Sequence, residues 1–200
     1  MRNAFTLIEL VFSMVIIAIA FSVLPKVLHL ATKSSITSLK EEAMYNAVAY
    51  AGLIRASAWD ENNTLVDDIL LVDNGDTSYE CSTTTGYRQG GFVGSRNCFN
   101  AQDASALGSD GGDLDDIDDF VTVSAQNFNS SRKYDISVGI DYVDDAFFST
   151  TSSSGTTNSK RVSIVVNPKR KASELGDSLV KLSFTLYNLG QLRVNKRSWN

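Results

Sequence analysis

A single carboxylate interrupts the apolar segment near the start of the chain. The segment Phe5–Leu24 (FTLIELVFSMVIIAIAFSVL) has about the length that a helix needs to cross the hydrocarbon core of a membrane. Glu9 is the only ionisable side chain in it. A carboxylate in hydrocarbon costs about 2.5–3.5 kcal/mol, so such a residue is a candidate functional group. We therefore expect Glu9 to pair with a cation.

Three interpretations of this segment are open. It is a secretory signal peptide cut after Ala20, a plain membrane anchor, or a helix that is retained after a cut just before it. The triplet Ala18-Ile19-Ala20 has the small-x-small form of a signal peptidase site. Against a signal peptide, Glu9 falls within the apolar region, and apolar residues continue past the cut to Leu24.

The heptapeptide from Ala4 to Leu10 (AFTLIEL) resembles the processing site of type IV pilins and type II secretion pseudopilins. In that family a short basic leader ends in a small residue, and the mature protein begins Phe-Thr-Leu-Ile-Glu. The resemblance implies that prepilin peptidase cuts between Ala4 and Phe5 and that the new amine of Phe5 is methylated. Ala4 stands where glycine is usual, which implies slower processing.

Cleavage at this position also supplies the cation that Glu9 needs. The new ammonium group of Phe5 lies within one helical turn of Glu9, or within reach of Glu9 on a neighbouring subunit. Buried opposite charges are tolerated when paired, whereas a charge that loses its partner is strongly destabilising. Glu9 is therefore predicted to form an assembly salt bridge that sets the register between subunits.

The residues from Phe5 to about Trp59 are predicted to form one long helix. Apolar residues recur at steps of three and four over Val27–Ala58, which indicates one apolar stripe on a helix. Pro25 is expected to kink this helix without ending it, because the periodicity resumes at once. The helix is predicted from Phe5 to about Trp59, and Asp60–Asn63 is predicted to end it.

The second half of the chain predicts strands. Alternating apolar residues indicate strands at Phe120–Val123, Tyr134–Tyr142, Val162–Val166 and Val180–Leu186, with a turn at 188–191 leading into Leu192–Val194. Thr77–Asp113 is predicted to be a long surface loop. The expected fold is α+β and pilin-like: a long N-terminal α-helix, transmembrane in its first half and amphipathic in its second, packed on an antiparallel β-sheet.

The predicted organisation has four parts. A leader peptide covers residues 1–4, the transmembrane or filament-core half of the helix 5–24, the amphipathic half 25–60, and a periplasmic β-rich head 61–200. The net charge of -5 gives no general case for binding nucleic acid. The basic run Lys169–Lys171 is predicted to be a solvated loop, with DNA or phosphate contact as the alternative. With one histidine, His29, and no nucleophile, zinc or P-loop motif, the chain is not expected to be an enzyme.

Two further sets of residues are candidate sites. Cys81 and Cys98 are predicted to form a disulfide if the head lies outside the cytoplasm, with free thiols as the alternative. The acidic run over residues 110–119 contains the candidate calcium ligands Asp113, Asp115, Asp116 and Asp118, because hard cations prefer several oxygen ligands from a compact loop. A solvated acidic loop, or an acidic patch facing the basic C-terminal region, is the interpretation that we favour, so no cofactor is expected.

The predicted function is that of a minor pilin or pseudopilin subunit that assembles through its helix into a type IV pilus-like filament. The implied partners are other pilin subunits, prepilin peptidase, the inner membrane and the filament assembly machinery. The implied location is the bacterial inner membrane with a periplasmic head, and then the filament or cell surface. The alternatives are a membrane-anchored adhesin or DNA receptor, a type II secretion pseudopilus component, and a secreted protein released after Ala20.

Overall fold

The computed structural model describes most of the helix and the central sheet of the head. The described residues are 6–64, 69–79, 81–82, 84, 86–88, 102–108, 114–123, 133–146, 149–169 and 176–189. The chain divides into two compact units, Met1–Glu42 and Ala43–Asn200.

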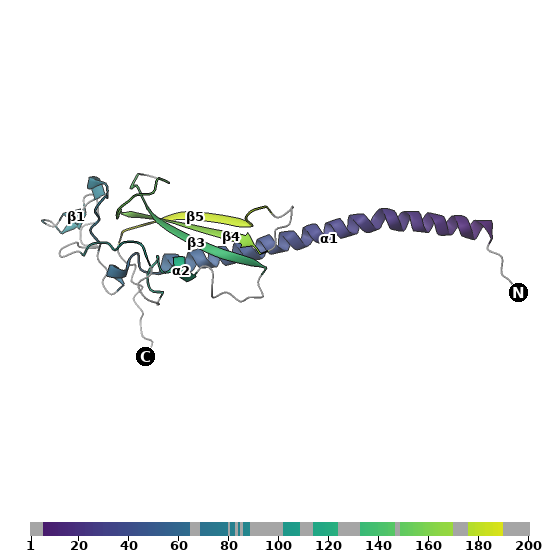
Figure 1. Ribbon diagram of the computed structural model, residues 1–200, viewed down its shortest axis with the longest axis horizontal. Helices are drawn as coiled ribbons and strands as arrows, with labels where there is room; N and C mark the ends of the chain where they lie inside the picture. Colours follow the sequence, from purple (N-terminus) through teal and green to yellow (C-terminus); the bar gives the residue numbers. More distant parts are fainter. Residues whose placement is uncertain are drawn as a thin grey trace, which may run out of the picture. The chain divides into compact units, whose positions relative to one another are not determined.

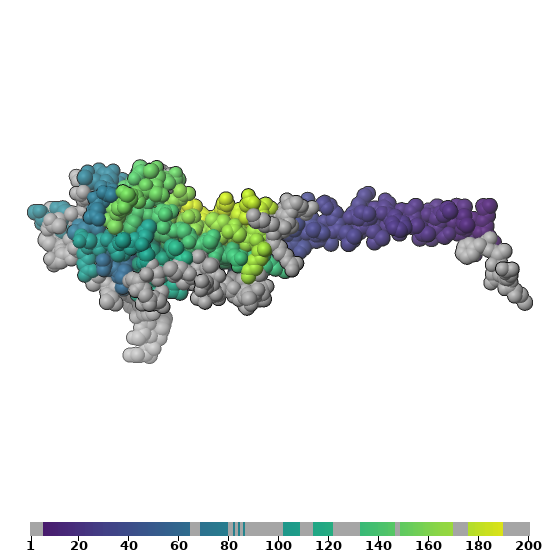
Figure 2. Space-filling model, viewed as in Figure 1, coloured from purple at the N-terminus to yellow at the C-terminus, as the bar shows by residue number. Residues whose placement is uncertain are grey.

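One helix makes up the described part of the first unit. Helix α1 runs from Leu7 to Ala56 and contributes its last turns to the second unit. It continues through Pro25, as the periodicity predicts. Figure 2 shows the side chains of its first turns, in purple, along a single helix.

The second unit is built on a three-stranded antiparallel sheet with the order β3-β4-β5 (Figure 1). The strands are β3 (Tyr134–Val143), β4 (Ser159–Pro168) and β5 (Val180–Tyr187). They confirm the predicted α+β arrangement of a long apolar helix and an antiparallel sheet. Strand β4 begins at Ser159, earlier than the predicted Val162, so Lys160 lies within the strand.

The core lies between one face of the sheet and the end of α1. The buried helix residues are mostly small, which lets the helix approach the sheet closely; they are Ala43, Ala47, Tyr50, Ala51 and Ile54. From the sheet, the register places side chains of the three strands in rows, such as Val138, Ile164 and Leu182. A hydrogen bond from Asn46 Nδ2 to the hydroxyl of Tyr134 joins the helix to β3.

The prediction of a strand at Phe120–Val123 is wrong, because these residues form the short helix α2 (Phe120–Val123). The side chain of Asp116 explains the difference. Its Oδ1 accepts hydrogen bonds from the backbone N–H groups of Asp118 and Asp119, at 2.9 and 3.1 Å. These local bonds start a turn ahead of an apolar run that would otherwise suit a strand.

The region predicted as one long loop contains some regular structure. It includes the 3-10 turn η2 (Thr77–Tyr79) and a two-residue antiparallel pair, β1 (Cys81–Ser82) with β2 (Tyr87–Arg88). Another 3-10 turn, η1 (Glu61–Asn63), follows α1. Asp60 caps η1, with the Asn63 side chain accepting from the Asp60 backbone N–H, so the chain turns where the sequence predicts the helix to end.

Candidate functional site

Glu9 lies in the first turn of α1 and contacts Thr6. Its Oε2 atom accepts hydrogen bonds from the Thr6 backbone N–H at 2.9 Å and from the Thr6 hydroxyl at 2.8 Å. A glutamate three positions after the capping residue commonly makes this bond, because the first backbone N–H groups of a helix have no partner within it. Thr6 thus places the Glu9 carboxylate back toward the N-terminal end of the helix.

The predicted partner of Glu9 is the amine of Phe5, a residue that the structure does not describe. Ala4 and Phe5 are outside the described residues, so the cleavage site and the pair between the Phe5 amine and Glu9 stay predictions. Both hydrogen bonds to Glu9 come from Thr6, the residue that directly follows Phe5. A carboxylate at this end of a helix is also favoured by the helix dipole.

The apolar side chains that follow Glu9 are uncovered. The large apolar residues from Leu7 to Leu30 are 48–83% exposed. The hydroxyl of Ser13 donates to the backbone oxygen of Leu10 at 2.9 Å, which satisfies this polar group within the helix. By length and composition, α1 could span a membrane. An apolar surface of this extent requires lipid or protein to cover it.

Comparison with known families agrees with this geometry. Residues 1–25 match the family model described as the prokaryotic N-terminal methylation motif. The chain carries the signature of type IV pilins and pseudopilins. The resemblance noted in the sequence is thereby confirmed, and this signature belongs to a class of structural subunits. No curated protein and no solved structure matches the chain.

In the head of this pilin-like chain, a lysine occupies a position that faces the core. The register places Lys160 of β4 between Tyr142 of β3 and Leu186 of β5. Its side chain is 0% exposed. Its Nζ atom lies 2.8 Å from Asp118 Oδ1 and 3.2 Å from Asp60 Oδ2, and it donates to the backbone oxygen of Trp59 at 2.9 Å.

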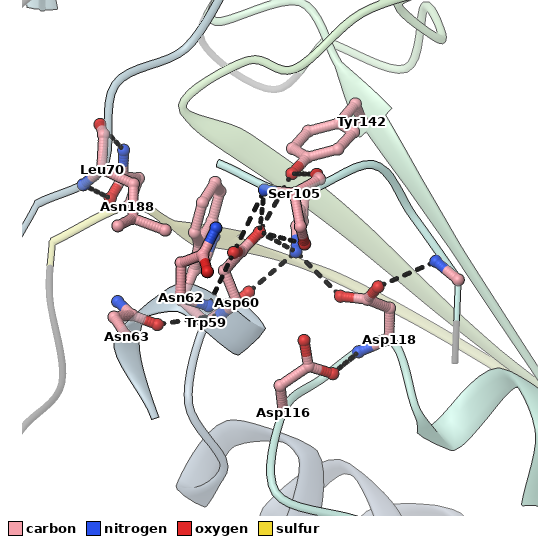
Figure 3. Close-up of polar contacts among 12 residues, drawn as sticks. Trp59, Asp60, Asn62, Asn63, Leu70, Ser105, Asp116, Asp118, Tyr142 and Asn188 are labelled. Atoms are coloured by element: carbon pink, nitrogen blue, oxygen red, sulfur yellow. Dashed lines mark hydrogen bonds and ion pairs between the residues drawn. The ribbon is translucent and has the colours of Figure 1, made fainter. Parts of the chain in front are cut away.

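The two carboxylates connect Lys160 to further parts of the head (Figure 3). Asp60 accepts from the backbone N–H and the hydroxyl of Ser105 and from the N–H of Asn62, at 3.0–3.1 Å. Asp118 accepts from the N–H of Gly108 at 2.9 Å. One buried set of charges therefore joins the start of η1, the segment 102–108, the turn before α2 and strand β4.

Burial also raises the pKa values of two neighbouring side chains. The pKa of Asp116 is raised to about 7, first by burial and then by the negative charge of Asp118. The pKa of Tyr142 is raised as well, by burial and by the charge of Asp60. The Tyr142 hydroxyl donates to the backbone oxygen of Ser105 at 2.8 Å, so it satisfies a backbone group while staying neutral.

The four candidate calcium ligands have different surroundings. Asp113 lies outside the described residues, Asp115 is exposed, and Asp116 and Asp118 are buried. Asp118 uses one oxygen for Lys160 and the other for Gly108. Within the described ranges, no group of three or more His, Cys, Asp or Glu residues is placed to hold a metal ion. Calcium binding stays a prediction.

The predicted disulfide is likewise untested. Cys98 and the side chain of Cys81 lie outside what the structure describes. In the basic run, Lys169 pairs with Asp135 at the surface, with Nζ and Oδ1 3.4 Å apart, and the other two residues of the run are not described. His29 is exposed on α1.

Sequence reasoning missed Lys160, although a signal was present. Lys160 precedes Val162 by two positions, and residues two apart in a strand point to the same face. Extending the alternation of β4 backward by one step would have placed this lysine in the core. Its partners come from distant parts of the sequence, so no local pattern indicates them.

The raised pKa of Asp116 predicts how the free energy of unfolding of the head depends on pH. Because its folded-state pKa of about 7 exceeds the ordinary 3.8, the folded chain holds a proton that the unfolded chain releases. This contribution to the free energy of unfolding is present below pH 3.8 and is lost as the pH rises to about 7. Denaturant titrations should show this fall in the wild type and a flatter profile in Asp116→Asn. Equal slopes in both proteins would contradict the assignment.

Proposed function

We propose that this chain is a minor pilin or pseudopilin subunit. Prepilin peptidase removes the leader before Phe5, and the subunit waits in the inner membrane with its head in the periplasm. It then enters a type IV pilus-like filament, in which neighbouring subunits cover its helix. The observation that carries the proposal is the methylation motif at residues 1–25, located on a helix with an uncovered apolar surface.

The last turns of α1 add a second argument. Ala43, Ala47 and Ile54 are buried in the head, whereas Tyr45, Val48 and Leu53 are 78%, 51% and 58% exposed. This part of α1 is therefore apolar on the side that packs in the head and on the side that does not. A helix that is apolar all round is normally buried in a larger assembly.

The occupant that fits this outer side is α1 of a neighbouring subunit. The side includes Gly52, where an added Cβ would meet nothing within 4 Å. Small residues allow two helices to approach closely, and the same property is available at Ser13, Ala18, Ala20 and Ser22 nearer the N-terminus. Exposed apolar side chains both here and in the membrane segment favour one helical partner over a separate ligand.

The ammonium group of Phe5 is the proposed partner of Glu9 in the filament. In the bilayer the pair lies near the cytoplasmic surface. In the filament it is enclosed by apolar helices, so a misplaced subunit leaves a charge unpaired. The cost of an orphaned buried charge then selects the correct axial position of each incoming subunit.

Substitutions at Glu9 test this role. Glu9→Ala is expected to leave the protein in the membrane fraction and to remove it from sheared filaments, as measured by immunoblotting of both fractions. Glu9→Gln is the discriminating variant, because its amide oxygen still accepts from Thr6 but carries no charge. We expect Glu9→Gln to be excluded as well; normal incorporation of this variant would contradict the charge pair.

The outer side of α1 gives a second test, at a residue that the head does not bury. Val48→Glu places a charge on the proposed helix contact and is expected to reduce incorporation into filaments while the free energy of unfolding changes little. Thr150→Glu adds the same charge at an exposed position in the loop between β3 and β4, and serves as the control. Equal incorporation of the two variants would argue against helix contacts on this side.

A further inference from the structure

The buried lysine and its carboxylates form a site with a chemistry of its own. We propose that Lys160 Nζ and the side-chain carboxyl group of Asp118 condense into an intramolecular amide bond, with Asp60 carrying the proton. This bond would fasten β4 to the turn before α2. The proposal does not depend on filament assembly.

Contact and enclosure both favour the reaction. Lys160 Nζ lies 2.8 Å from Asp118 Oδ1, and the two side chains are 0% and 2% exposed. Two aromatic rings line the amine, since Nζ is 4.5 Å from the centre of the Trp59 ring and 5.1 Å from that of Tyr142. Two reactive groups held together in a dry site gain the advantage of an intramolecular reaction.

The hydrogen bonds distinguish the two carboxylates. Asp60 accepts from two donors of Ser105 and from the N–H of Asn62, and these bonds hold its carboxylate beside the amine. Among the described contacts, Asp118 accepts one backbone hydrogen bond, from Gly108, besides its contact with Lys160. Asp118, the carboxylate closer to Nζ, is therefore assigned as the electrophile, and Asp60, 3.2 Å from Nζ and fixed by its hydrogen bonds, as the proton acceptor.

The reaction needs no co-reactant. A proton passes from the Lys160 ammonium group to the Asp118 carboxylate, giving an amine and a carboxylic acid. The nitrogen lone pair then attacks Cγ of Asp118, Asp60 accepts a proton from the nitrogen, and it returns that proton to the departing hydroxyl group. The N–Cγ bond forms, one C–O bond breaks, and one water molecule leaves, so charge and atoms balance.

The product removes two of the three buried charges, and the third, Asp60, keeps its hydrogen bonds from Ser105 and Asn62. Taking a lysine and an aspartate out of water is expensive, and their mutual attraction often fails to repay it. The amide is neutral, and its remaining N–H retains acceptors in Asp60 and in the backbone oxygen of Trp59. The bond also links positions 42 residues apart, which restricts the unfolded chain.

Peptide mapping of the purified full-length chain tests the proposal. After reduction, alkylation and tryptic digestion, we expect peptide 97–132 joined to peptide 134–161, with a mass lower by one water molecule than the sum of the two. Trypsin should not cut after Lys160, because an acylated lysine is not a substrate. The exposed pair of Lys169 and Asp135 is an internal control that should stay unlinked.

Other digestion products would contradict the proposed bond. Separate peptides with a free C-terminal Lys160, or a bond from Lys160 to Asp60, overturn the proposal. Asp60→Asn is expected to slow the appearance of the linked peptide in newly synthesised chains by about 100-fold, the scale of general-base catalysis. Linking at the wild-type rate in this variant would remove Asp60 from the reaction. If the variant does not fold, the digest of the wild type still decides.

Discussion

One carboxylate on an apolar helix sets the conditions for the rest of this molecule. Glu9 lies in the first turn of α1, among side chains that are largely exposed. Neither a bilayer nor a layer of packed helices solvates a carboxylate, so Glu9 has to be paired wherever the helix resides. Thr6 supplies hydrogen bonds but no charge. The missing positive charge is the reason that processing, membrane insertion and assembly are coupled in the proposed mechanism.

The head also contains a buried charge, and there the same chain supplies the partners. Lys160 faces the core of the sheet, and Asp60 and Asp118 neutralise it within the chain. Because these partners come from the start of η1 and the turn before α2, the lysine holds together elements that are distant in the sequence. At the N-terminus the proposed partner would be created by proteolysis, so that pairing would be available only to the mature subunit. One buried charge thus organises the fold, and the other is proposed to organise the filament.

The sequence predicted the parts of this structure that depend on local periodicity. Steps of three and four residues identified α1, and alternation identified β3, β4 and β5, because burial of one face imposes these patterns. Phe120–Val123 was assigned wrongly, since its apolar residues suit a strand while the Asp116 side chain starts a helical turn. Lys160 was missed because its burial depends on Asp60, 100 residues earlier in the chain. No local pattern indicates such a contact.

The N-terminal peptide of the subunit isolated from cell envelopes tests the central claim most directly. If α1 is retained and Glu9 is paired with a new amine, mass spectrometry should find a chain that begins at Phe5 and carries an N-methyl group. A chain that still contains Met1–Ala4, or one that begins at Phe21, would contradict the account. In the first case Glu9 has no new amine beside it, and in the second it is no longer part of the protein.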